Sequence, residues 1–320
     1  MSENFLIYVA ITSFFSGIII TPAILPLLRR LKVGQNIREE GPESHLKKSG
    51  TPTMGGVVFI LAASLTTILF APKDPLVLMA MFATVSYGLI GFVDDYIKVV
   101  LRRSLGLKAR EKLIFQTLVA LIMYVTIVYL GLSTEVLIPF FGNVELGYLY
   151  FPFILVIFLG ASNATNMTDG LDGLLAGTFS FSILGMIYIT FSQDEIGLGI
   201  FALSLLGGTL AFLVYNAHPA KLFMGDTGSL ALGGGLASLA ILTKTELLLI
   251  PLGAVFVVET LSIIIQVTSF KLTGKRVFLM SPIHHHFELK GWSEWKIVLV
   301  FWFVQLLFTL LAIVLWNLYY

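Results

Sequence analysis

Residues 297–317 read IVLVFWFVQLLFTLLAIVLWN, a run that holds no Asp, Glu, Lys or Arg. A helix needs roughly 20 such residues to cross the hydrocarbon core of a bilayer. This run therefore predicts a membrane-spanning helix, and the rest of the chain follows the same pattern.

The composition of the whole chain indicates a polytopic membrane protein. Its 320 residues are 57% hydrophobic and only 12% charged, whereas a soluble domain carries about 25% charged residues. The mean hydropathy is +0.92. We therefore predict an all-α fold in a single domain, 1–320, with about ten transmembrane helices. They are expected near 5–28, 54–71, 76–93, 113–131, 151–166, 174–191, 197–215, 229–243, 247–270 and 297–317.

Composition also excludes several classes of function. A net charge of +1 gives no reason to expect a nucleic-acid partner. Cysteine is absent, which rules out disulfides and thiolate chemistry. Only His, Asp and Glu remain as expected metal ligands.

Charge fixes the expected orientation. No basic residue precedes the first apolar run, which favours a signal anchor with its N-terminus outside over a cleaved signal peptide. With ten spans, the inner segments then hold 18 of the 20 Lys and Arg residues, as the positive-inside rule predicts. Both termini are expected to be extracytoplasmic. Segment 133–150 reads as two alternating runs around Gly142 and Asn143, which predicts a small extracytoplasmic β-hairpin.

The same predicted membrane topology brings acidic side chains from separate loops to the inner face. Asp94 and Asp95 end an apolar helix, and neighbours on a helix diverge by about 100°. We therefore expect one to face a site and the other to meet a lysine or a backbone donor. The alternative is an interfacial pair solvated by water and by Lys98.

Two further motifs carry carboxylates. In NATNMTDGLDG, the side chains of Asn166, Asp169 and Asp172 suit the edge of a base or a sugar. In KLFMGDTGSL, a glycine-rich turn opens a helix at Asp226, where backbone amides favour phosphate and a carboxylate can hold Mg²⁺. For Asp169 and Asp226 the alternative is simple helix capping.

Three histidines, His284, His285 and His286, follow Pro282 in a predicted loop. We expect them to donate hydrogen bonds to phosphate oxygens in an anionic pocket. A metal site or a solvated loop is the alternative. Acids, imidazoles and lysines gathered at a membrane face predict phosphoryl transfer between a soluble and a lipid substrate.

Four stretches together resemble the bacterial phospho-N-acetylmuramoyl-pentapeptide transferases: GFVDDYIKV, NATNMTDGLDG, NAHPAKLFMGDTGSLALGG and SPIHHHFELKGWSEWK. The resemblance runs from about Gly34 to Trp302. Related transferases of N-acetylhexosamine 1-phosphate share the acidic motifs, but the PIHHHFE run favours the muramoyl-pentapeptide family. A sister enzyme using UDP-GlcNAc, or a secondary transporter, remains the alternative.

The resemblance implies the reaction and its setting. It implies Mg²⁺-dependent transfer of phospho-MurNAc-pentapeptide from UDP-MurNAc-pentapeptide to undecaprenyl phosphate, which yields lipid I and UMP for peptidoglycan synthesis. The site would face the cytoplasm from the bacterial cytoplasmic membrane, and the protein could form a homodimer. Whether attack is direct or passes through a covalent intermediate stays open.

The resemblance also implies roles for individual residues. Asp226 resembles the Mg²⁺ ligand, and Asp94, with Asp95 beside it, the residue that deprotonates or orients the lipid phosphate. The resemblance also implies a catalytic role for His285. The ninth helix is expected to be interrupted, and Glu259 and Gln266 are compatible with a polar break. Substrate contacts are implied for Lys48, Thr53, Lys112, Asn166, Asp169, Asp172, Asn216, Phe223, Gln266, His284 and His286.

Overall fold

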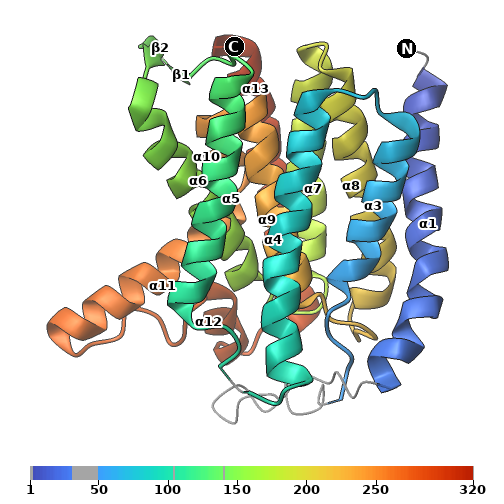
Figure 1. Ribbon diagram of the computed structural model, residues 1–320. Helices are drawn as coiled ribbons and strands as arrows, with labels where there is room; N and C mark the ends of the chain where they lie inside the picture. Colours follow the sequence, from blue (N-terminus) through green and yellow to red (C-terminus); the bar gives the residue numbers. More distant parts are fainter. Residues whose placement is uncertain (1–2, 31–49, 104, 140, 320) are drawn as a thin grey trace.

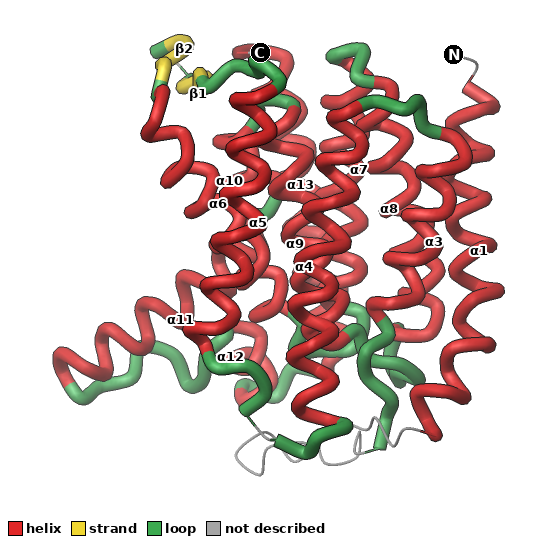
Figure 2. Tube along the Cα trace, viewed as in Figure 1, coloured by secondary structure: helices red, strands yellow, loops and turns green. Residues whose placement is uncertain are grey.

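Long helices packed side by side form a bundle, shown in Figure 1 and by secondary structure in Figure 2. This computed structural model describes residues 3–30, 50–103, 105–139 and 141–319. The long helices are α1 (Glu3–Arg30), α3 (Gly56–Phe70), α4 (Pro75–Val99), α5 (Ala109–Tyr129), α6 (Tyr150–Thr168), α7 (Leu174–Ser192), α8 (Ile196–Asn216), α9 (Gly225–Leu242), α11 (Ala254–Thr273) and α13 (Glu294–Tyr319). Short helices are η1 (Gly147–Leu149), η2 (Glu246–Leu248), α10 (Leu249–Leu252) and α12 (Ile283–Leu289).

The predicted class, an all-α polytopic membrane protein, is confirmed. Among the described residues, 8 helices are long and apolar enough to cross a membrane. Helices α3 and α9 stand at the two other predicted positions. Helix α3 has only 15 residues, and α9 opens with the polar sequence Gly225–Ser229, which lowers its hydropathy. Outward-facing apolar side chains, such as Leu118, Ile122 and Val125 of α5, suit contact with lipid.

Helix α9 is the centre of the bundle. Every residue from Thr227 to Ile241 is buried, and α4, α6 and α3 pack around it. Small residues permit this close packing, as is common between membrane helices. A Cβ added at Gly91 of α4 would lie 2.0 Å from the carbonyl oxygen of Asp226, and one at Gly56 of α3 would lie 2.2 Å from the Cα of Gly228.

The ninth predicted span, 247–270, is interrupted. Helix α10 ends at Leu252, Gly253 follows, and α11 then leaves the bundle as a projecting arm (Figure 1). The interruption is therefore confirmed, but its expected cause is wrong. Glu259 and Gln266 lie within the continuous helix α11, and the break falls at Gly253, where backbone freedom is greatest.

The predicted hairpin is present, with its turn displaced. Strand β1 (Glu135–Ile138) pairs antiparallel with β2 (Gly142–Glu145), and Ile138 faces Gly142. Gly142 and Asn143 therefore begin the second strand and do not form the turn.

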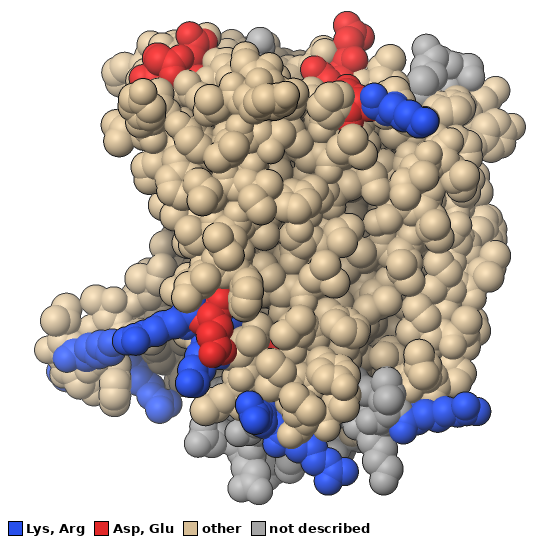
Figure 3. Space-filling model, viewed as in Figure 1, with Lys and Arg blue, Asp and Glu red and all other residues tan. Residues whose placement is uncertain are grey.

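The two ends of the bundle differ in charge. Figure 3 shows Lys and Arg mainly along one end and on the projecting arm. Helix α1 begins and α13 ends at the opposite end, which also carries the hairpin (Figure 1). The arrangement matches the charge asymmetry on which the predicted orientation rests.

Candidate functional site

The site is built where the last turn of α4 meets the first turn of α9. The missing side chain at Gly91 lets the backbone of Asp226 approach α4 one turn before Asp94 and Asp95. Ligand oxygens of Asp94, Asp95 and Asp226 consequently lie within 4.8 Å of one another. The structure thus brings together the three acidic residues that the sequence placed in two separate motifs.

Asp95 holds the start of α9. Its carboxylate accepts hydrogen bonds from the amide of Asp226 (3.2 Å), the amide of Thr227 (2.9 Å) and the Thr227 hydroxyl (2.7 Å). The first amides of a helix have no partner within that helix. The Asp95 carboxylate on α4 accepts their hydrogen bonds, as an N-cap side chain would. Asp226 makes no such bond, which excludes the capping role considered for it.

Asp94 and Asp226 share two lysines. The Nζ of Lys98 lies 2.5 Å from Asp94 Oδ2 and 3.2 Å from Asp226 Oδ2. The Nζ of Lys112, from the first turn of α5, lies 3.0 Å and 2.6 Å from the same two oxygens. The other oxygen of Asp94 accepts the amide of Leu107 at 2.7 Å. Buried charges are tolerated only when paired in this way.

The donor set of this cluster suits a hard cation. Carboxylate oxygens are the ligands that Mg²⁺ takes in proteins, usually one or two together with phosphates and water. Both oxygens of Asp95 already accept hydrogen bonds from the first turn of α9. Asp226 and Asp94 are therefore the residues that could coordinate a metal. The two ammonium groups beside them could bind phosphate oxygens.

Asn166 and Asp169 border the cluster on the α6 side. The Asn166 amide donates to Asp226 Oδ1 (3.0 Å) and to the Ser229 hydroxyl (2.9 Å). Asp169 is the C-cap residue of α6, and Gly173 is the N-cap residue of α7, so Asp169 does not cap α7. Although its side chain keeps partial access to solvent, loss of solvation raises the pKa of Asp169 to about 8, together with the negative charges of Asp226, Asp95 and Asp172.

Asp172 and Asn216 are buried anchors of the turn between α6 and α7. Asp172 Oδ2 accepts the amide of Ala220 at 3.0 Å and lies 3.0 Å from His218 Nδ1, while the Asp172 amide donates to Glu294 at 2.7 Å. Asn216 accepts the amide of Gly173 and donates to the carbonyl of Leu222, both at 3.0 Å. The α6–α7 turn is thereby tied to the loop after α8.

Thr53 and Phe223 lie on two segments that run side by side. Phe223 N donates to Pro52 O at 2.8 Å, and Gly55 N donates to Phe223 O at 2.9 Å. Thr53 is buried beside Gly225, at the start of α9. Lys48 lies outside the described residues.

The three histidines lie on helix α12, not in the predicted loop, so they point in different directions. His284 is fully buried, with its Nδ1 3.1 Å from Glu259 Oε1. The Nδ1 of His285 lies 2.6 Å from Glu288 Oε2. His286 Nδ1 accepts the amide of Leu279 at 3.1 Å. The Nδ1 atom of each imidazole is thus engaged by a protein partner.

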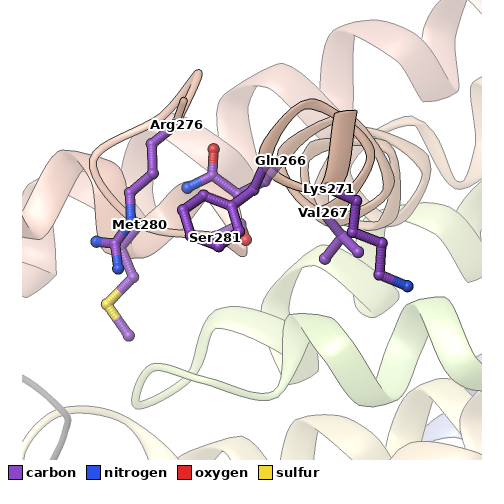
Figure 4. Close-up of a pocket in the computed structure, with 7 residues that line it drawn as sticks. Gln266, Val267, Lys271, Arg276, Met280 and Ser281 are labelled. Atoms are coloured by element: carbon purple, nitrogen blue, oxygen red, sulfur yellow. The ribbon is translucent and has the colours of Figure 1, made fainter. Parts of the chain in front are cut away.

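Gln266 belongs with the projecting arm. Its side-chain oxygen accepts the amides of Val277 and Phe278, and its nitrogen donates to the carbonyl of Phe278, all at 2.9 Å. These bonds hold the return loop, residues 274–282 between α11 and α12, against α11. Gln266 also lines an open pocket of about 590 Å³ with Lys271 and Arg276 (Figure 4). The structure groups Gln266 with this pocket and not with the carboxylate cluster.

Lys98 is the main site residue that the sequence analysis missed. It was considered only as a solvating neighbour, although its position four residues after Asp94 places both on one helix face. Thr227 and Ser229 were also missed. Their signal was weaker, because they become site residues only through contacts with α4 and α6.

Comparison with known proteins identifies the sequences that this chain is similar to. The model of glycosyl transferase family 4 matches residues 77–244, and a signature of phospho-N-acetylmuramoyl-pentapeptide-transferase matches residues 48–60. Proteins named phospho-N-acetylmuramoyl-pentapeptide-transferase are 50% identical in Bacillus subtilis (strain 168) and 52% identical in Anoxybacillus flavithermus (strain DSM 21510 / WK1), each over 318 residues and 98% of both chains. The protein of that name from Geobacillus sp. (strain WCH70) is 52% identical over the same share.

Proposed function

This chain belongs to the phospho-N-acetylmuramoyl-pentapeptide-transferase family of membrane phosphotransferases, and from that membership we propose its reaction. It transfers phospho-MurNAc-pentapeptide from UDP-MurNAc-pentapeptide to undecaprenyl phosphate. In a direct transfer, an oxygen of the lipid phosphate attacks the phosphorus that is bound to the sugar. The bond from that phosphorus to the bridging oxygen breaks, UMP leaves, and lipid I is the product.

The observation that carries this proposal is the cluster of Asp94, Asp226, Lys98 and Lys112. The four charged groups come from three helices, and each ammonium group lies within 3.2 Å of an oxygen of both carboxylates. A cluster of this kind suits a diphosphate with its metal, because the ammonium groups can turn to phosphate oxygens while the carboxylates take the cation. It lies at the end of the bundle where the basic loops gather, as expected for a site on the cytoplasmic side of the bacterial membrane.

Mg²⁺ is the proposed cofactor, with Asp226 as principal ligand and Asp94 beside it. When bound, the ion neutralises the diphosphate and the departing UMP. The residues of the chain do the remaining work. Asp95 fixes the start of α9 and with it the direction of Asp226. Lys98 and Lys112 hold phosphate oxygens, and Asp94 orients the attacking lipid phosphate between them.

The turn 169–173 with Asn166 and Phe223 is the proposed nucleoside edge. Asn166 lies directly against Asp226, so a nucleotide held there would place its diphosphate at the carboxylates. The carboxyl group of Asp169 can accept hydrogen bonds from the hydroxyls of the substrate or from its base.

The decisive assay is release of UMP by the purified protein in detergent. We expect UMP only when UDP-MurNAc-pentapeptide, undecaprenyl phosphate and Mg²⁺ are all present. Asp226→Asn should reduce turnover by at least about a hundredfold while the thermal midpoint is retained, because an amide oxygen can still accept from Asn166. Near-normal turnover of a folded Asp226→Asn protein rejects the proposed ligand. Equal or faster turnover with UDP-GlcNAc assigns the chain to the sister activity instead.

A further inference from the structure

A buried carboxylate–imidazole pair lies behind the turn that carries Asp169 and Asp172. Glu259 of α11 and His284 of α12 both have no exposed surface, and Glu259 Oε1 lies 3.1 Å from His284 Nδ1. A carboxylate oxygen accepts from an imidazole N–H, so we assign the ring proton to Nδ1, the nitrogen that faces Glu259. The contact therefore fixes both the tautomer and the orientation of the imidazole.

The far side of the ring meets the turn directly. A Cβ added at Gly170 would lie 2.2 Å from His284 Nε2, which means that the imidazole rests against the backbone of Gly170. The other sides of the turn are held by side chains already described, Glu294, His218 and Asn216. His284 thus supplies a contact from the direction of α11 and α12.

Stability alone does not explain the pair. Both His284 Nε2 and Glu259 Oε2 are buried, and neither has a hydrogen-bond partner among the residues that the structure describes. A buried polar atom left without a partner costs about 1–3 kcal/mol, and an apolar pair of the same volume would avoid that cost. A polar pair at this position is better explained by the geometry that it imposes on its neighbours.

We propose that Glu259 is a positioning residue for the transfer reaction: it fixes the His284 imidazole against Gly170 and thereby sets the shape of the turn 169–173 that receives the nucleotide. The role in nucleotide binding rests on the proposed function. The effect on the turn does not, because it follows from the contacts within the chain. Glu259 acts through His284 and does not itself contact the substrate.

The test is a double-mutant cycle with two readouts. Glu259→Ala, His284→Ala and the double variant are compared for the KM and kcat of UMP release, and for hydrogen exchange of the peptide that covers residues 169–173. We expect Glu259→Ala to raise the KM for UDP-MurNAc-pentapeptide roughly tenfold and to change kcat little. The double variant should be no worse than His284→Ala, because residues that act through one another are not additive. Glu259→Gln should restore the KM, since its amide oxygen can still accept from Nδ1.

Glu246→Ala is the matched control. Glu246 is also a buried carboxylate with one oxygen that has no hydrogen-bond partner within the described part of the chain, but it lies at the other end of the bundle, bonded to Tyr150 at 2.7 Å. It should lower the thermal midpoint and leave the KM and the exchange of the turn unchanged. Additive effects in the cycle, an unchanged KM with Glu259→Ala, or an equal rise with Glu246→Ala overturns the positioning role. If the wild-type protein releases no UMP, the proposed function fails, and hydrogen exchange alone decides whether Glu259 and His284 hold the turn.

Discussion

Asp94 and Asp95 are adjacent in the chain, yet they meet different partners. The 100° between neighbours on a helix turns Asp95 to the amides of α9 and Asp94 to Lys98 and Lys112. This division matches the expectation that one would face the site and the other a backbone donor. Of the two neighbours, it is therefore Asp94 that shares the flexible lysine side chains with Asp226.

The division predicts different consequences for the two Asp→Asn changes. Asp95→Asn leaves one oxygen to serve three donors, so the free energy of unfolding should fall by about 1–3 kcal/mol, and activity should fall with it. Asp94→Asn should abolish most activity with a smaller loss of stability. Thermal midpoints and UMP release, measured on the same preparations, check both. The assignment is reversed if Asp94→Asn is the variant that unfolds.

Asp169 predicts a dependence of stability on pH. Its pKa is raised from 3.8 to about 8 in the fold, so the folded protein binds the proton more tightly than the unfolded chain. Stability contributed by this proton is complete at low pH and is lost as the pH rises through about 8. Asp169→Asn cannot lose it. The thermal midpoint of the variant relative to wild type should therefore rise between pH 5 and pH 9, and a constant difference would contradict the shift.

Much of the site at this scale could be predicted from sequence. The predicted membrane topology alone placed Asp94, Asp226 and Lys112 on one face of the membrane. Lys98 was interpreted only as a solvating neighbour of the acidic pair. The directions of the His284 and Gln266 side chains could not be predicted, because they are set by Glu259 and by the return loop of the arm. Such contacts join residues distant in sequence, and residue types alone do not encode them.

At the scale of elements, the junction of α4 and α9 decides the geometry of the site. Gly91→Ala would place a Cβ 2.0 Å from the Asp226 carbonyl, a backbone atom that cannot move alone. The two helices must separate, at a cost of about 1–3 kcal/mol. We expect a lower thermal midpoint and a loss of UMP release that exceeds the unfolded fraction, because Asp226 moves away from Asp94.

Gly160→Ala is the control for this change. Gly160 lies on the exposed face of α6, and nothing stands within 4 Å of a Cβ added there. Alanine should leave activity unaltered and stabilise the helix slightly. Equal losses with both alanines would show that helix packing, and not the α4–α9 contact, controls the site.

Apolar runs predicted the existence of the helices better than their ends. All ten expected positions carry helix, since length and hydropathy are properties of the local sequence. The position of the break at Gly253, the short helix α12 and the turn before Gly142 were not anticipated. Each depends on how a neighbouring element packs, which a hydropathy pattern does not contain.

At the scale of the whole molecule, charge asymmetry predicts which end faces the cytoplasm. The loops at the end that holds the carboxylate cluster are basic, and the end with the hairpin is not (Figure 3). Positively charged loops are retained inside during insertion. The cluster, the turn 169–173 and α12 should therefore all be reached from the cytoplasm, where a soluble sugar nucleotide is available.

Single cysteines test this orientation without background, because the chain has no cysteine of its own. Tyr148, which is 92% exposed beside the hairpin, and Leu105, which is 83% exposed in the loop between α4 and α5, mark the two ends. A maleimide that cannot cross the membrane should label Tyr148→Cys in intact cells and Leu105→Cys only after permeabilisation. Labelling of Leu105→Cys in intact cells would place Asp94 outside, because the Leu107 amide is bonded to that carboxylate. A cytoplasmic sugar nucleotide could then not reach the cluster, and the proposed reaction would be excluded.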